Sequence, residues 1–380
     1  MNKYSIPFNK PFLTGKELTY IEEAVHSGKI SGDGIFTKKC HAFFENNYAI
    51  KKALMTTSCT DALELAALLC NIQPGDEVIM PSYTFVSTAN AFVLRGATIR
   101  FVDSLPMHPN MDVNKIEELI NSKTKAIVPM HYAGIACDMD KIMDLGNKYN
   151  LYIVEDAAQA IDSYYKGLPL GTIGHFGAFS FHETKNIISG EGGLLAINDN
   201  KFVLRAEILR EKGTNRSSFF RGEVDKYGWV DIGSSFLPSE VISAFLYAQL
   251  ENLQQIQKRR IELWNQYYKG LGNLENKGVL KRPILFDYAS NNAHMFFILL
   301  ENVETRDNLI VYLKTKGILA VFHYQSLHLS PYFNDKHDGR ELPYADNYSD
   351  CLLRLPLYFE LNDNQISEVI NAIQEFFHKD

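Results

Sequence analysis

From about residue 50 the chain alternates between short continuous apolar runs and longer amphipathic segments. Short continuous apolar runs are typical of strands buried on both faces, and the segments between them are typical of helices. The pattern predicts strands at residues 77–81, 97–103, 126–129, 152–154, 176–181 and 193–197, and helices at 61–70, 113–119 and 139–149. This alternation predicts an α/β fold with a mostly parallel central sheet flanked by helices on both faces.

A second region begins with an amphipathic segment from Ser239 to about Tyr268. Apolar residues recur there at helical spacing, at Ile242, Leu246, Leu250, Leu253 and Ile256, which predicts one long helix. Beyond it, expected elements at 295–300, 307–314 and 320–324 alternate between strand and helix, and a helix over 365–377 follows. We therefore expect a large domain over residues 1–250, including an N-terminal segment, and a smaller C-terminal α+β domain over 251–380.

The charge balance is mildly acidic, with 38 Lys and Arg against 45 Asp and Glu and a net charge of −7. It supports neither a nucleic-acid nor an anionic-membrane partner, so a bound phosphate must be held by local geometry. No apolar run approaches the roughly 18 residues of a membrane span, and residues 1–12 lack the apolar core of a secretory signal. The five cysteines are scattered without a CxxC pair, as in a reducing cytoplasm. We expect a cytoplasmic protein without a metal site.

Two residues with reactive side chains follow expected strands. Asp156 ends the apolar strand in VEDAAQ, where a buried carboxylate needs a cation or donor. By itself it is compatible with a helix cap or a surface acid, or with pairing to the protonated ring nitrogen of a pyridine cofactor. Lys185, in SFHETKN, follows another buried strand and precedes a run of glycines at 190–193. Burial there would lower its pKa, as a Schiff-base lysine requires, and the glycines would let the backbone approach a ligand.

Two further features are compatible with a phosphorylated aromatic ligand. Ser58, Cys59 and Thr60 precede the helix expected from Asp61, where small residues cap helices and free N–H groups also bind anions. Phe85, in PSYTFVST, follows the next strand and could stack on a flat ring or fill the core. Because the carboxyl ends of parallel strands meet at one edge of a sheet, the phosphate cradle, aromatic ring, acid and lysine are expected to converge there.

Several longer stretches resemble, together and over nearly the whole chain, the sugar aminotransferases of the DegT/DnrJ/EryC1/StrS family. They are PSYTFVSTANAFVLRGA, HYAG, VEDAAQ, SFHETKN, GEGG, REKGTNRSSFFRG and VFHY. The resemblance implies the fold of type I pyridoxal-phosphate (PLP) enzymes and a homodimer with active sites at the interface. The stretches are most similar to the branch that aminates TDP-4-keto-6-deoxyglucose to TDP-4-amino-4,6-dideoxygalactose, as in enterobacterial common antigen synthesis.

The resemblance also implies roles for individual residues. Lys185 matches the lysine that binds the cofactor and shuttles protons, Asp156 the partner of the pyridine nitrogen, and Gln159 a residue near the ring hydroxyl. Ser180, Cys59 and Thr60 match phosphate contacts, and Phe85 a residue that stacks on the ring. L-Glutamate is then the amino donor, and 2-oxoglutarate the second product. Contacts to the sugar or nucleotide are considered, beside simple core packing, for four residues: His131, His182, His323 and Tyr324.

One stretch departs from the family pattern. Many members carry Gly-x-Asn-x-Arg, whose Asn reaches the cofactor phosphate of the neighbouring subunit, whereas residues 233–237 here read GSSFL. Ser235 replaces the Asn and can donate one hydrogen bond over a shorter reach. Leu237 replaces the Arg, so no substrate contact carries over from that position.

Other functions fit the sequence less well. Relatives that dehydrate or deoxygenate sugars carry His in place of Lys185, and an NAD-dependent oxidoreductase would need a G-x-G-x-x-G turn after its first strand. The glycines at 171, 174 and 177 have the wrong spacing and lead into a strand. A non-catalytic binding protein on the same scaffold, or an aminotransferase for a 3-keto, UDP-linked or GDP-linked sugar, remains an alternative.

Overall fold

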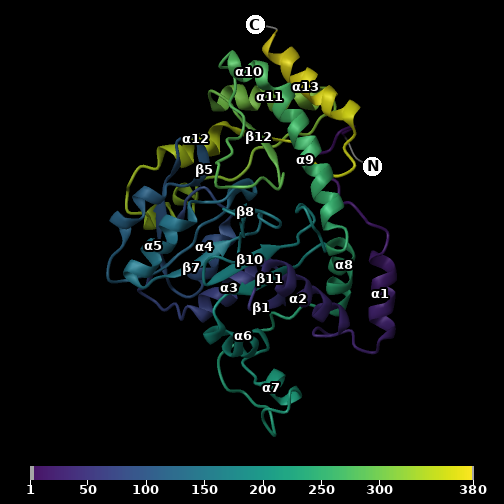
Figure 1. Ribbon diagram of the computed structural model, residues 1–380. Coiled ribbons are helices and arrows are strands. Elements are labelled where there is room, and N and C mark those ends of the chain that lie inside the picture. Colours follow the sequence, from purple (N-terminus) through teal and green to yellow (C-terminus); the bar gives the residue numbers. More distant parts are fainter. Residues whose placement is uncertain (1–3, 379–380) are drawn as a thin grey trace.

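A computed structural model describes residues 4–378, and a seven-stranded sheet lies at its centre (Figure 1). In spatial order its strands are β1 (Lys52–Thr56), β11 (Gly193–Ile197), β10 (Phe176–Ser180), β7 (Tyr152–Asp156), β6 (Thr124–Ile127), β2 (Glu77–Pro81) and β3 (Thr98–Val102). Strand β11 is antiparallel to both neighbours, and the other paired strands are parallel. The α/β fold with a mostly parallel sheet, predicted from the sequence, is confirmed.

Helices cover both faces of the sheet because successive side chains of a strand point to opposite sides. In β1, Leu54 packs on the side of α3 (Cys59–Leu69), α4 (Val86–Val93) and α6 (Val203–Arg210). Its neighbours Ala53 and Met55 pack on the side of α2 (Ile35–Tyr48), α5 (Met139–Tyr149) and α8 (Glu240–Leu250). The two layers bury the sheet and leave its strand ends as the place where polar side chains can gather.

A third apolar cluster lies in the C-terminal part of the chain. It contains residues of α9 (Leu253–Gly270), α10 (Gly272–Asn276), α11 (Val303–Thr315), α13 (Asp363–Phe377) and the antiparallel pair β12 (Phe296–Leu299) and β13 (Leu352–Leu355). Ile6 joins this cluster, with its backbone N–H donating to the Gly317 carbonyl. Residues of α12 (Pro343–Cys351) pack instead against the cluster on the α3 side of the sheet. The domain boundary expected at residue 250 stays a prediction.

Three expected elements differ from the structure. The long helix over 239–268 is two helices, α8 and α9, separated where Asn252 leaves the helical conformation and its side chain binds the Ala248 carbonyl. The helix over 113–119 is two 3₁₀ turns, Val113–Lys115 and Glu117–Leu119, because its apolar residues recur every three positions. The strand over 320–324 makes a single bridge, from Val321 to Arg354.

The N-terminal helices pack against α8 beside the sheet. The helix α1 (Glu17–His26) contacts α8, and α2 is preceded by Gly34, which has no side chain to cap it. The buried carboxylate of Glu240 accepts hydrogen bonds from the N–H groups of Gly34 (2.9 Å), Phe36 (2.8 Å) and Thr37 (3.1 Å). An acid on one helix thus satisfies the free N–H groups at the start of another.

The remaining elements are short. They are the hairpin β4 (Ser104–Leu105) and β5 (His108–Met111), the hairpin β8 (Tyr164–Tyr165) and β9 (Leu168–Pro169), and α7 (Arg216–Phe220). Figure 1 shows α7 on a loop that projects from the rest of the molecule. Within residues 4–378, no helix is both long enough and apolar enough to cross a membrane.

Gly177, in the middle of β10, allows this strand to pack closely against the turn at Gly171. A Cβ at this position would overlap the backbone of Gly171. We predict that Gly177→Ala lowers the free energy of unfolding by about 1–3 kcal/mol or more, measured by thermal or denaturant unfolding. Gly228→Ala is the matched control, because a Cβ there meets nothing within 4 Å. Equal stability of the two variants would contradict the prediction.

Candidate active site

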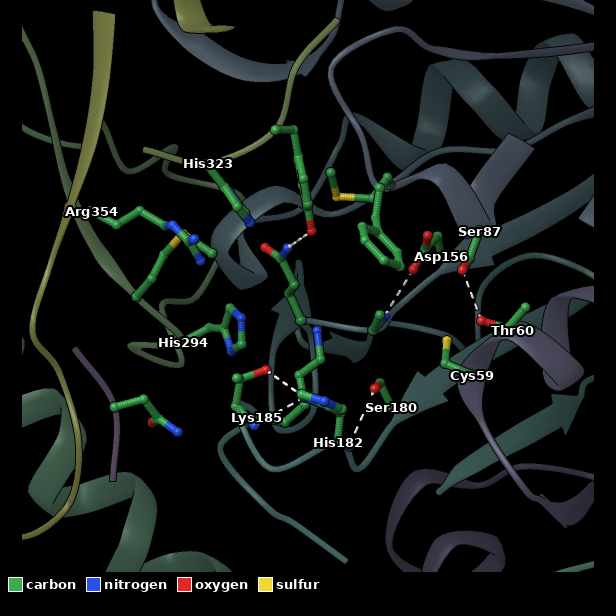
Figure 2. Close-up of a pocket in the computed structure, with 18 of the residues that line it drawn as sticks. Cys59, Thr60, Ser87, Asp156, Ser180, His182, Lys185, His294, His323 and Arg354 are labelled. Atoms are coloured by element: carbon green, nitrogen blue, oxygen red, sulfur yellow. Dashed lines mark hydrogen bonds between the residues drawn. The ribbon is translucent and has the colours of Figure 1, made fainter. Parts of the chain in front are cut away.

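A cavity of about 550 Å³ lies where the strand ends of the sheet face the C-terminal part of the chain (Figure 2). Eleven of the residues singled out from the sequence line it. They are Ser58, Cys59, Thr60, Phe85, Asp156, Gln159, Ser180, His182, Lys185, His323 and Tyr324. Their positions follow the rule that ligands of an open α/β sheet bind at the carboxyl ends of its strands.

Asp156 is the last residue of β7, and its buried carboxylate is held from two sides. Thr88, on α4, donates its hydroxyl to Oδ2 (2.7 Å), and the N–H of Ala158 donates to Oδ1 (3.1 Å). No Lys, Arg or His side chain lies within ion-pair distance of this carboxylate in residues 4–378. A buried anion held in this way is suited to a cationic group bound in the cavity.

Lys185 lies five residues beyond the end of β10, in a turn closed by its N–H to the His182 carbonyl (2.9 Å). Burial lowers the pKa of its amine, while the nearby Cys59 and Asp156 partly oppose that shift. The amine makes no hydrogen bond or ion pair within residues 4–378. A lowered pKa and the lack of a partner make this lysine better suited to act as a nucleophile and proton carrier than an exposed lysine.

The start of α3 forms the end of the cavity suited to an anion. Ser58 caps the helix by accepting a hydrogen bond from the Asp61 N–H (3.0 Å), which leaves Cys59 and Thr60 in the first turn. Thr60 Oγ1 lies 2.8 Å from Ser87 Oγ, and Ser180 ends β10 nearby (Figure 2). Free N–H groups, hydroxyls and the positive end of the helix dipole together favour a phosphate.

One glycine of the run after Lys185 makes a close contact within the fold. A Cβ at Gly193 would overlap the backbone of Ser58 and Cys59. This glycine therefore brings the start of α3 against β11, and the expected approach of the run to a ligand stays a prediction. It fixes the phosphate cradle relative to the strands that carry Lys185 and Asp156.

The C-terminal segment forms the facing wall through His323 and Tyr324, and Gln159, which follows β7, contacts this wall. Gln159 accepts a hydrogen bond from the Ala133 N–H (2.6 Å) and donates one to the Tyr324 hydroxyl (2.8 Å). The His323 ring stacks on Tyr324 at 3.6 Å between centroids, and its Nδ1 lies 2.7 Å from the Tyr132 hydroxyl. Burial, with the nearby Arg354 charge, holds the pKa of His323 well below its usual range, so the ring is neutral.

Phe85 and His182 lie at the open side of the cavity. Phe85 precedes the first turn of α4, and 54% of its surface is exposed although it borders the cavity. An exposed aromatic ring beside a cavity is available to stack on a flat ligand. His182 is partly exposed and binds Thr184 through Nδ1 (2.9 Å).

Two residues predicted from the sequence do not reach this cavity. His131 is fully buried, with Nε2 3.0 Å from Glu155 and Nδ1 accepting from the Cys137 N–H (3.2 Å). Both ring nitrogens are used inside the fold, so the structure does not bring His131 to a substrate. Ser235 is exposed and lies outside the cavity of its own chain. Its expected contact is with a second subunit and stays a prediction.

Three residues of the site were missed in the sequence. Thr88 orients Asp156, and Arg354 and His294 line the cavity from β13 and from the segment before β12. Arg354 had a detectable signal, because a charged residue interrupts the apolar strand Leu352–Leu355. The other two had none, because hydroxyls and histidines beside apolar segments are common.

These residues fit pyridoxal phosphate. The start of α3 with Ser180 would hold the phosphate, Asp156 would face the protonated ring nitrogen, and Lys185 would reach the reactive carbon. The buried acid without a cation and the buried amine without a partner are each complemented by this one group.

Comparisons with known proteins agree with this assignment. The sequence profile of the DegT/DnrJ/EryC1/StrS aminotransferase family matches residues 11–374. The chain is 33% identical to the GDP-perosamine synthase of Escherichia coli O157:H7 over 377 residues, which are 98% of each chain. Among solved structures it is similar to the aminotransferase TlmJ from Streptoalloteichus hindustanus, with a TM-score of 0.90, 29% identity and coverage of 98% and 99%. It is also similar to the PLP form of Spr1654 from Streptococcus pneumoniae, with a TM-score of 0.89, 26% identity and 99% coverage of both chains.

The family match spans nearly the whole chain, and the cavity brings together a lysine, an acid and a helix start that fit the cofactor. The resemblance seen in the sequence is thereby confirmed at the level of the family. The chain belongs to the DegT/DnrJ/EryC1/StrS family of pyridoxal-phosphate-dependent sugar aminotransferases.

Proposed function

We propose that the protein transfers the amino group of L-glutamate to C-4 of TDP-4-keto-6-deoxy-D-glucose, giving TDP-4-amino-4,6-dideoxy-D-galactose and 2-oxoglutarate. The observation that carries amino transfer is the buried, unpartnered Lys185 amine in one cavity with the buried Asp156 carboxylate. The TDP-linked 4-keto sugar is supported by the stretches SFHETKN and REKGTNRSSFFRG, which resemble the branch that acts on it.

Several residues of the cavity have a role in the proposed reaction. Pyridoxal phosphate, when bound, supplies a carbonyl carbon that accepts the amino group and a ring that withdraws electrons. Lys185 takes a proton from the α-carbon of the donor and later returns one to C-4 of the sugar. Asp156, oriented by Thr88, keeps the ring nitrogen protonated. The start of α3 and Ser180 hold the phosphate, and Phe85 packs on the ring.

We also propose that the enzyme acts as a homodimer with its active sites at the interface, and that Ser235 donates to the cofactor phosphate of the partner subunit. Large apolar side chains are exposed in the segment that precedes Ser235, with 84% of Trp229 and 68% of Phe220 accessible in the single chain. Exposed aromatic side chains of this size are typical of a surface that a partner covers.

A second candidate substrate is a GDP-linked keto sugar. The 33% identity to a GDP-perosamine synthase over 98% of the chain favours it. The same lysine, acid and phosphate cradle would serve, because the nucleotide lies away from the reacting carbon.

The substrate is tested by incubating the purified enzyme with L-glutamate and either TDP-4-keto-6-deoxyglucose or the corresponding GDP-linked sugar. We expect the TDP-linked amino sugar by mass spectrometry, with proton NMR showing the galacto configuration at C-4. Amination of the GDP-linked sugar alone would assign the second candidate. No product from either sugar would contradict both.

Lys185 is predicted to be indispensable. Lys185→Ala should reduce formation of the amino sugar by at least about 10²- to 10⁴-fold, because proton transfer to and from carbon loses its carrier. Product formation by mass spectrometry and the absorbance of the bound cofactor are the two measurements. Lys201→Ala, which removes an exposed lysine paired with Asp199, is the matched control. Undiminished turnover in Lys185→Ala would remove the basis of the proposal.

Asp156 is predicted to act through its charge. Asp156→Asn keeps the shape and the hydrogen bond from the Thr88 hydroxyl but removes the anion that holds the ring nitrogen protonated. We expect kcat to fall by about 10²- to 10³-fold, while the cofactor remains bound. Asp140→Asn, at an exposed residue paired with Lys166, should leave kcat unchanged. A wild-type kcat in Asp156→Asn would show that the charge is not required.

A further inference from the structure

Arg354 extends from β13 into the cavity without an anionic partner. Its backbone pairs with Val321, and its Nε and Nη2 donate only to the Phe322 carbonyl (3.3 and 3.0 Å). The guanidinium lies 4.7 Å from the centre of the Phe8 ring, and no carboxylate within residues 4–378 is at ion-pair distance. Burial lowers the pKa of Arg354. A partly buried guanidinium that lines a cavity with free donors is available to bind an anion there.

His294, on the same wall of the cavity, offers a hydrogen-bond acceptor instead of donors. The Asn186 amide nitrogen donates to Gln257 Oε1 (2.8 Å) and to the Asn292 carbonyl (2.8 Å), so the Asn186 oxygen must face His294 Nδ1 (2.8 Å). Nδ1 therefore carries the hydrogen, and Nε2 keeps its lone pair. Burial, with the charges of Lys185, Arg260 and Arg354, holds the pKa of His294 well below its usual range. Nε2 is thus a neutral hydrogen-bond acceptor available to a ligand in the cavity.

We propose that Arg354 and His294 form the subsite for the amino donor, with Arg354 binding its α-carboxylate and His294 Nε2 accepting a hydrogen bond from its amino group. An α-amino acid is the one reactant of the proposed function, on which this inference rests, that carries both groups on the reacting carbon. The planar fork of arginine matches a carboxylate in two parallel hydrogen bonds.

The position of Arg354 favours the donor over the other anions of the reaction. Figure 2 shows Cys59, Thr60 and Ser180 on one side of the cavity and Arg354 on the other, with His294 and Lys185 between them. The cofactor phosphate is therefore held elsewhere. The diphosphate of a nucleotide sugar is separated from the reacting carbon by the sugar ring. Arg354 also contributes to lowering the pKa of the Lys185 amine. Its charge therefore acts at the lysine with which the donor reacts.

The carboxylate contact is tested by measuring the affinity of the holoenzyme for 2-oxoglutarate and for TDP by calorimetry. Arg354→Gln should weaken 2-oxoglutarate binding about 10- to 100-fold and leave TDP binding unchanged, because it removes a charge-assisted contact to the carboxylate alone. Arg354→Lys keeps the charge but loses the planar fork of donors, so its affinity for 2-oxoglutarate should lie between those of the wild type and Arg354→Gln. Arg306→Gln, which removes a buried guanidinium paired with Asp307 outside the cavity, should behave as wild type.

Weakened TDP binding with unchanged 2-oxoglutarate binding would assign Arg354 to the nucleotide and overturn the inference. Unchanged binding of both ligands would overturn it as well. If Arg354→Gln does not fold, Arg354→Lys decides in the same assay. If the wild-type enzyme makes no TDP-linked amino sugar but its 2-oxoglutarate affinity depends on Arg354, the proposed sugar is wrong and the donor subsite stands.

The contact to the amino group is tested with His294→Phe, which keeps a ring and removes the acceptor. We expect the rate constant for conversion of the bound cofactor to its pyridoxamine form at low L-glutamate to fall about tenfold. Binding of 2-oxoglutarate, which has no amino group, should be unchanged. A fall in 2-oxoglutarate affinity, or an unchanged conversion rate, would show that His294 does not bind the donor amine.

Discussion

Asp156 and Lys185, one buried anion and one buried amine in a single cavity, impose the constraint on which the rest of the site depends. Neither group forms an ion pair within residues 4–378, and burial without a partner is unfavourable for both. The fold tolerates this because β7 and β10 are locked side by side in the centre of the sheet, with Ala178 paired to Asp156. Under the proposed function, pyridoxal phosphate would complement both groups, so the same burial that costs stability would tune the chemistry.

Close backbone contacts around these strands hold Asp156 and Lys185 in place. Gly177 lets β10 lie against the turn at Gly171, and Gly193 lets the start of α3 lie against β11. Both contacts bring backbone nearer than any side chain would allow. Thr88, from α4, then orients the carboxylate of Asp156 by a hydrogen bond of 2.7 Å. The sheet edge is therefore a rigid half-site that holds acid, lysine and phosphate cradle in fixed relation.

The other half of the site comes from the C-terminal part of the chain and is built from neutral or cationic groups. Burial lowers the pKa of both His294 and His323, while Arg354 retains the charge. The two halves are joined by Gln159, which holds the Tyr324 hydroxyl, and by Asn186, next to Lys185, which holds His294. The guanidinium of Arg354 and the neutral ring of His294, both on this wall, suit the carboxylate and the amino group of the donor.

The sequence by itself determined six of the seven sheet strands, all but β1, the mostly parallel sheet and many of the residues that line the cavity, because apolar runs and strand-end residues are local features. It also carried the motifs that match the family. It did not determine that 239–268 is two helices, that residues 320–324 are no strand, or that His131 is bound to Glu155. Nor could it show the neutral form of His294 or the unpaired Arg354. Those features depend on contacts between distant residues, such as Asn186 with Gln257, 71 positions apart, and Tyr132 with His323, 191 apart. Only tertiary packing decides which polar groups find partners and which are left for a ligand.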